Sequence, residues 1–204
     1  MLQKTYAEVS FKSDVDHLNV QYKRDFLTPQ KADKYYKILD DFIKGIDNND
    51  NKRFFISFGD KETCKVYPDA KSWDESNDII CQIIRVMRHQ VEKFTGSKCN
   101  YVYINRYPTG TIGMNKHRDK EVTGEKPIIA GISLGSVREI QFTPDNFIPE
   151  EMPKKISFSL DHGSIYVMNY PTNSFWLHEI LKQTKVYGSR ISLTFRYVYP
   201  IEDK

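Results

Sequence analysis

The sequence is poor in cysteine, has no long apolar run and shows no strong excess of one charge. Its 204 residues include only Cys64, Cys81 and Cys99, and no two of them form a Cys-x-x-Cys pair. This spacing argues against a thiolate zinc site and against a disulfide framework, so we expect three reduced thiols in an intracellular protein of the nucleus or cytoplasm. The first residues lack the apolar core of a signal peptide, and no run approaches the roughly 18 apolar residues of a membrane span. We therefore expect no membrane partner.

The composition is that of a globular protein with a mildly basic surface. Hydrophobic residues make up 39% of the chain and aromatic residues 13%, which argues against wholesale disorder. A net charge of +3 permits a nucleic-acid partner without requiring one. No repeat or linker divides the sequence, so we expect one domain over residues 1–204, and a monomer.

Two helices are predicted in the first half of the chain. Over residues 28–45, Thr28 is a possible N-cap, Pro29 suits the first helical position and Gly45 can end the helix. Apolar residues spaced three and four apart predict one buried face for this helix and for a second one ending at Gly96. The residues expected to face inward are Ala32, Tyr35, Tyr36, Leu39, Phe42 and Ile43 in the first helix, and Ile79, Ile80, Ile83, Ile84, Met87, Val91 and Phe94 in the second.

From residue 100 onward the pattern changes to short strands separated by turns. The expected strands are YVYINRY, IIAGISL, REIQFT, KISFSL, SIYVMNY and RISLTFRYVY. Two helices followed by closely spaced strands predict an α+β fold, in which N-terminal helices (within residues 1–98) support a β-sandwich or jelly roll over residues 99–200.

The stretch NKHRDKE raises the question of a metal site. On a strand, His117 and Asp119 would point to the same side with Cα atoms roughly 7 Å apart. His-x-Asp alone is weak evidence, and a solvated charged loop explains it equally well. His178, among bulky apolar residues in TNSFWLHEI, is either a buried structural histidine or a third ligand. Two histidines and one carboxylate would leave open positions of the kind found in non-haem Fe(II) oxygenases.

The strand RISLTFR offers cations for an anionic co-substrate. Arg190, Ser192, Thr194 and Arg196 share one of its faces, while the alternate residues are apolar. Arginines in a core-like strand are costly to bury without anions, and a dicarboxylate would supply them. An edge strand with a solvated charged side remains an equally good interpretation of this segment alone.

The segments NRYPTGTIGMNKHRDKE, DHGSIYVMNYPTNSFWLHEI and RISLTFRYVYP together resemble the AlkB family of Fe(II)/2-oxoglutarate-dependent nucleic-acid dealkylases, nearest its duplex-DNA-repairing branch. The likeness covers residues 100–200 and implies a double-stranded β-helix (jelly-roll) core with a nucleotide-recognition lid among residues 1–98. It also implies Fe(II), 2-oxoglutarate and O₂ as cofactors. Carried over by position, the iron ligands are His117, Asp119 and His178, and the 2-oxoglutarate contacts are Asn105, Tyr107, Arg190, Ser192, Thr194 and Arg196. Ser192 departs from the family, which usually has asparagine there.

The resemblance further implies oxidative demethylation of DNA bases such as 1-methyladenine and 3-methylcytosine, with release of formaldehyde and succinate. Methylation makes these bases cationic and blocks their pairing, which favours a nearby carboxylate and lowers the cost of extrusion. Glu121 and Arg118 are expected near the substrate, and Tyr67 at the position of the aromatic residue that stacks on the base, although each also fits an ordinary surface or lid residue. An RNA demethylase and a catalytically inactive nucleic-acid-binding module are the alternatives.

Overall fold

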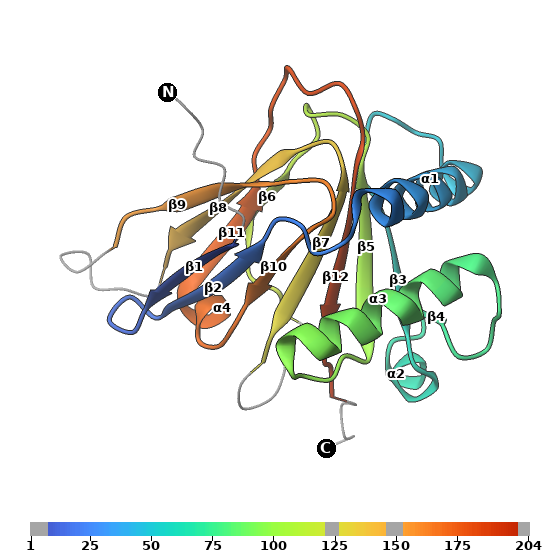
Figure 1. Cartoon of the computed structure of the whole chain (residues 1–204), viewed down its shortest axis with the longest axis horizontal. Helices are drawn as coiled ribbons and strands as arrows, with labels where there is room; N and C mark the ends of the chain where they lie inside the picture. Colours follow the sequence, from blue (N-terminus) through green and yellow to red (C-terminus); the bar gives the residue numbers. More distant parts are fainter. Residues whose placement is uncertain (1–7, 121–126, 146–152, 200–204) are drawn as a thin grey trace.

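The computed structural model describes residues 8–120, 127–145 and 153–199 (Figure 1). The helices are α1 (Pro29–Ile46), α2 (Lys61–Val66), α3 (Ile79–Thr95) and α4 (Thr172–Phe175). The strands are β1 (Glu8–Ser13), β2 (Leu18–Lys23), β3 (Phe54–Gly59), β4 (Lys71–Ser72), β5 (Tyr101–Tyr107), β6 (Met114–His117), β7 (Ile129–Gly135), β8 (Arg138–Pro144), β9 (Ile156–Leu160), β10 (Ser164–Met168), β11 (Trp176–Ile180) and β12 (Arg190–Arg196).

The strands form two sheets that pack face to face. The larger sheet has the order β1-β2-β10-β7-β12-β5-β3-β4, and the smaller has the order β6-β11-β8-β9. Side chains from both sheets build one apolar cluster, which includes Val20 and Ile129 from the larger sheet and Phe142 and Trp176 from the smaller. Burial of these side chains holds the sheets together.

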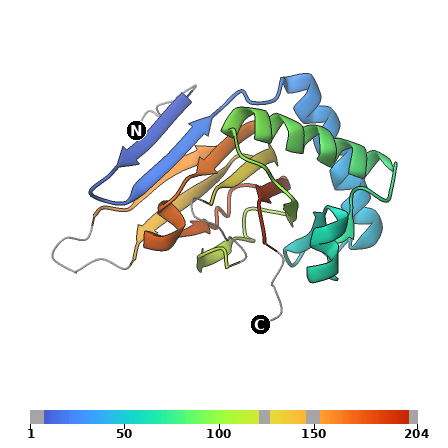
Figure 2. The same cartoon turned by 90° about the horizontal axis from the view of Figure 1, so that it is seen from below.

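The helices α1 and α3 form a third layer on the outer face of the larger sheet (Figure 2). Leu39 and Ile43 from α1 and Ile84 and Met87 from α3 are fully buried there, against apolar residues of β5, β7 and β12 such as Leu193. A jelly-roll sandwich supported by N-terminal helices is therefore confirmed as the α+β fold.

The two predicted helices are present, with small differences at their ends. Thr28 is the N-cap residue of α1 but its side chain makes no capping hydrogen bond, and the helix continues past Gly45 by one residue. Gly96 ends α3 in the left-handed conformation, as expected. The prediction that Ile79 and Phe94 face the core is wrong, because they are 48% and 39% exposed at the two ends of the helix.

Several strands were not anticipated from the sequence. The hairpin β1–β2 extends the larger sheet beyond β10, and β3 with β4 extends it beyond β5. Strands β6 and β11, which carry the two candidate histidine ligands, belong to the smaller sheet. All three cysteines are free. None of the helices in the described part of the chain is long and apolar enough to cross a membrane.

Candidate active site

A cavity of about 710 Å³ lies between the two sheets. Its walls include Asn105 from β5, His117 from β6, His178 from β11 and Thr194 from β12. Small-molecule sites typically occupy roughly 300–1,000 Å³, so this cavity has room for a co-substrate and part of a larger substrate.

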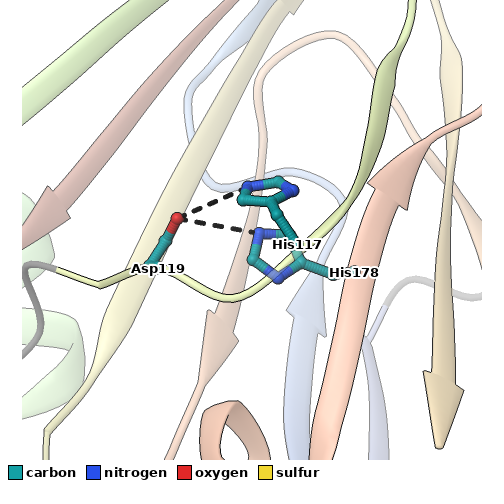
Figure 3. Close-up of side chains that lie close together, drawn as sticks. All are labelled: His117, Asp119 and His178. Atoms are coloured by element: carbon teal, nitrogen blue, oxygen red, sulfur yellow. Dashed lines mark ion pairs between the residues drawn. The ribbon is translucent and has the colours of Figure 1, made fainter. Parts of the chain in front are cut away.

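The cavity brings His117, Asp119 and His178 together (Figure 3). Antiparallel pairing of β6 with β11 puts His117 directly opposite His178. The Nε2 atoms of these histidines lie 3.5 Å and 4.0 Å from Oδ1 of Asp119, and one ligand atom from each residue lies within 4.8 Å of the others. Two imidazoles and one carboxylate converging on one point are the ligand set of a non-haem Fe(II) centre.

The hydrogen bonding of His117 suits a metal ligand. Its Nδ1 atom lies 2.9 Å from the carbonyl oxygen of Asn115, which can only accept, so Nδ1 carries the hydrogen. In the neutral ring Nε2 then presents a lone pair to the Asp119 carboxylate. Two acceptors facing one another are stabilised by a cation between them, and a metal ion would be such a cation.

The charges of Asp119 and His178 are also those that metal binding requires. Burial opposes ionisation of Asp119, but the charge of Arg196, whose Nη2 is 3.2 Å from Oδ2, holds its pKa well below the usual value. Burial lowers the pKa of His178 to about 4, so this ring is neutral at physiological pH. The site therefore offers one anionic and two neutral donors when His117 is also neutral.

The residues expected to bind 2-oxoglutarate gather beside this cluster. Five of them line the cavity: Asn105, Tyr107, Ser192, Thr194 and Arg196. They lie on the same side of the neighbouring strands β5 and β12, whose register places Asn105 opposite Ser192. The period-two pattern of RISLTFR is thus realised, with its apolar residues packed under the helices.

Arg190, the sixth of these residues, is buried next to the cavity wall and is 1% exposed. Its Nε donates to Oγ of Ser133 at 2.8 Å, and its guanidinium lies 5.3 Å from the centre of the Tyr107 ring. Its Nη1 and Nη2 atoms have no hydrogen-bond partner among the described residues. A buried cation with two open donors fits the bidentate geometry of a carboxylate, as 2-oxoglutarate would provide.

The residues expected to contact the substrate are less closely grouped. Arg118 lines the cavity, and its Nη2 pairs with Oδ2 of Asp145 at 2.6 Å. Tyr67 is not among the lining residues and packs against Tyr101 instead, with ring centroids 5.3 Å apart. Glu121 lies outside the described residues.

Tyr103 and Arg53 are among the cavity residues that the sequence analysis missed. Tyr103 lines the cavity, and alternation with Asn105 along YVYINRY was the signal that could have found it. Arg53 lines it too, and donates to Oδ1 of Asn105. Arg53 lies just before β3, in a stretch for which the sequence predicted no element, so nothing in its neighbourhood pointed to the site.

Residues 58–196 match the 2OG-Fe(II) oxygenase superfamily. The chain belongs to this superfamily. Fe(II), 2-oxoglutarate and O₂ are therefore its cofactors, in agreement with the His-Asp-His cluster.

Curated relatives of this oxygenase confirm the resemblance to the AlkB family and to its DNA-demethylating branch. The chain is 34% identical over 123 residues to the DNA oxidative demethylase ALKBH2 of Bos taurus. The aligned region covers 58% of this chain and 44% of that protein. It is 32% identical over 126 residues to the human alpha-ketoglutarate-dependent dioxygenase alkB homolog 3, with 58% and 43% covered. The matched regions thus span less than half the length of these relatives.

Solved structures share the fold of this oxygenase at low sequence identity. A prolyl hydroxylase of Trichoplax adhaerens, in complex with a peptide of the hypoxia-inducible factor, has a TM-score of 0.60 at 11% identity, with 88% of this chain and 83% of that chain covered. OsALKBH1 has a TM-score of 0.54 at 15% identity, with 87% and 96% covered. Both comparisons support the jelly-roll architecture.

Proposed function

We propose that this chain is a dioxygenase that removes N-alkyl groups from DNA bases such as 1-methyladenine and 3-methylcytosine. The observation that carries the proposal is that two unlike features occur at one cavity, one in its lining and one buried next to its wall. Three metal-ligand atoms lie within 4.8 Å of one another, and Arg190, buried against the lining residue Tyr107, has two open donors. An iron site needs the first feature, and a 2-oxo acid co-substrate needs the second.

In this proposal His117, Asp119 and His178 would hold Fe(II), beside the residues that would bind the co-substrate. Bound iron supplies the oxidation in which 2-oxoglutarate and O₂ yield succinate, carbon dioxide and a hydroxylated N-methyl group, which then leaves as formaldehyde. Arg190 orients the co-substrate through its distal carboxylate, and Arg196 keeps Asp119 ionised. The other 2-oxoglutarate contacts are Asn105, Tyr107, Ser192, Thr194 and Arg196.

Charges and rings around the cavity support a nucleic-acid substrate. Besides Arg196, the lysines and arginines in its lining are Arg53, Lys116, Arg118, Lys120 and Lys182. Such a rim attracts a phosphate backbone, whatever the base sequence. Tyr103 in the lining offers a flat ring for an extruded base, which makes it a better candidate for stacking than Tyr67. We propose Arg118 and Glu121 as further substrate contacts. Because the proposed substrate is a nucleic acid, we also propose the nucleus or cytoplasm as the compartment of the protein.

The test is an oligonucleotide demethylation assay with Fe(II), 2-oxoglutarate and oxygen. Short strands carrying one 1-methyladenine are supplied as single-stranded DNA, duplex DNA and RNA, and mass spectrometry follows loss of the methyl group. We expect turnover on DNA, with stoichiometric formaldehyde and succinate, and none for His117→Ala or without 2-oxoglutarate.

The three substrates separate the remaining alternatives. Faster turnover on RNA than on either DNA would replace the DNA substrate while keeping the chemistry. Binding of all three oligonucleotides without turnover, in protein shown to contain iron, would contradict the proposal and favour an inactive nucleic-acid-binding module.

A further inference from the structure

The three candidate ligands are not held in place equally well by the fold. His117 is the last residue of β6 and is paired across the sheet with His178 in the middle of β11. Ladder hydrogen bonds of the smaller sheet therefore fix the backbone of both histidines. Asp119 lies two residues beyond the end of β6, where it has no strand partner among the described residues.

The side chain of Asn173 takes the place of that strand partner. Its Oδ1 accepts from the backbone N–H of Asp119 at 3.2 Å, and its Nδ2 donates to the carbonyl oxygen of Asp119 at 2.9 Å. An amide side chain bonded to both backbone groups of one residue reproduces the exchange made by a hydrogen-bonded pair in an antiparallel sheet. Asn173 belongs to α4, which leads directly into β11 and thus to His178.

We infer that Asn173 is a positioning residue that sets the affinity and geometry of the metal site through the backbone of Asp119. The inference rests on the proposed function, because it takes the three-residue cluster as the iron site. Arg196 attracts Oδ2 of Asp119 from one side, while Oδ1 faces the two histidines at 3.5 Å and 4.0 Å. Because Asn173 holds the backbone of Asp119, Oδ2 of the carboxylate can pair with Arg196 while Oδ1 faces the two histidines.

Without Asn173, the segment after β6 loses both hydrogen bonds that fix Asp119. The ion pair with Arg196 remains and can draw the carboxylate away from His117 and His178. Partners that orient metal ligands typically change metal affinity by roughly 10- to 100-fold when they are removed. We expect a change of this size in the dissociation constant, with altered coordination of any metal that still binds.

The test measures metal binding without turnover. Co(II) is titrated into the metal-free protein in the presence of 2-oxoglutarate, with calorimetry for affinity and visible absorption for coordination. Asn173→Leu keeps the side-chain size and removes both hydrogen bonds, whereas Asn173→Asp keeps only the acceptor. Asn169→Leu is the matched control, because Asn169 is equally half-buried just before α4 and its amide bonds to Asn19 instead.

We expect Asn173→Leu to weaken Co(II) binding about 10- to 100-fold and to shift the absorption bands, with a smaller effect for Asn173→Asp. Asn169→Leu should bind within about twofold of wild type, far below the effect expected of a ligand's partner. Wild-type Co(II) affinity and spectrum in Asn173→Leu, or equal losses of Co(II) affinity in Asn173→Leu and Asn169→Leu, would overturn the inference. If Asn173→Leu does not fold, Asn173→Asp is judged by the same criteria. Wild-type protein that binds no Co(II), or binds it equally well after His117→Ala, would instead contradict the proposed function.

Discussion

Replacing Arg190 by methionine should have opposite effects on the free protein and on the protein with its co-substrate. Arg190 is 1% exposed, and only its Nε has a hydrogen bond, to Ser133. The Nη1 and Nη2 atoms have no acceptor in the described part of the chain, and burial lowers the pKa of the guanidinium. The free protein therefore carries a buried charge that no anion compensates, and methionine would relieve this cost.

The size of each effect depends on whether the guanidinium of Arg190 has a carboxylate partner, which it lacks in the free protein and gains when 2-oxoglutarate binds. Replacing an uncompensated buried charge by a well-packed apolar side chain should stabilise the free protein by about 1–2 kcal/mol. This stabilisation corresponds to a melting temperature roughly 2–8 °C higher. Losing the guanidinium partner of a buried carboxylate costs about 3–5 kcal/mol, which weakens 2-oxoglutarate binding roughly 100- to 5,000-fold. Arg190→Lys should fall between, because an ammonium cannot bind a carboxylate bidentately.

Arg138 provides the matched control, since it is a second fully buried arginine near the cavity. Its guanidinium is satisfied by backbone carbonyl oxygens, those of Thr109, Gly110, Ile112 and Leu181. Arg138→Met removes these hydrogen bonds. The oxygens of Thr109 and Gly110 keep a backbone N–H partner, but those of Ile112 and Leu181 lose the guanidinium at about 1–3 kcal/mol each, so the variant should lower the melting temperature. The assays are thermal unfolding without ligand and 2-oxoglutarate titration with Mn(II) present. Arg190→Met that melts below wild type, or that binds 2-oxoglutarate normally, would refute the reasoning.

Three further outcomes are expected. Tyr103→Ala should weaken binding of an oligonucleotide with a methylated base by about 1–3 kcal/mol, whereas Tyr67→Ala changes it less; equal losses in fluorescence titrations would contradict this. Asp40→Asn should lower stability at pH 7 by about 3 kcal/mol, because Asp40 pairs with buried Arg106. The pKa of Asp40 lies below its ordinary 3.8, because the interactions with Lys44 and Arg106 outweigh the effect of burial. The contribution of Asp40 to stability is therefore present above pH 3.8 and lost in stronger acid. Lowering the pH should thus narrow the difference in unfolding free energy between Asp40→Asn and wild type. Ser192→Asn should tighten 2-oxoglutarate binding about 2- to 12-fold by adding a hydrogen bond, measured by calorimetry.

Local patterns in the sequence were sufficient to predict the elements whose faces differ in polarity. Alternation placed Ser192 and Thr194 on one face of RISLTFR, and Asn105 with Tyr107 on one face of YVYINRY. In the structure these two strands are neighbours and both faces line one cavity. This works because a strand has a strict period of two and a misplaced register would bury every polar residue in the apolar core. Helix ends were harder to predict, since Ile79 sits at the frayed edge of a face whose centre is buried.

Features that depend on pairing between distant segments could not be read in this way. Asn173 contacts Asp119 across 54 positions of sequence, and nothing around either residue predicts the contact. Arg53 reaches Asn105 only because β3 adds to the edge of β5. His117 and Asp119 raised the question of a metal site because they are near neighbours, but that pair alone was weak evidence. His178 required either the family resemblance or the pairing of β6 with β11.

The strand β12 explains why stability and catalysis can vary separately in this fold. Its residues Ile191, Leu193 and Phe195 are completely buried under the helices, so their truncation creates cavities in the main core. The intervening side chains, such as Arg190 and Thr194, face the site and contribute polar groups that the free protein does not fully use. Substitutions on the first face should therefore lower stability. Those on the second should weaken co-substrate binding, and for Arg190→Met this occurs while the free protein gains stability. One strand holds the core together and presents the co-substrate contacts, and its alternation keeps the two roles on opposite sides of a single sheet.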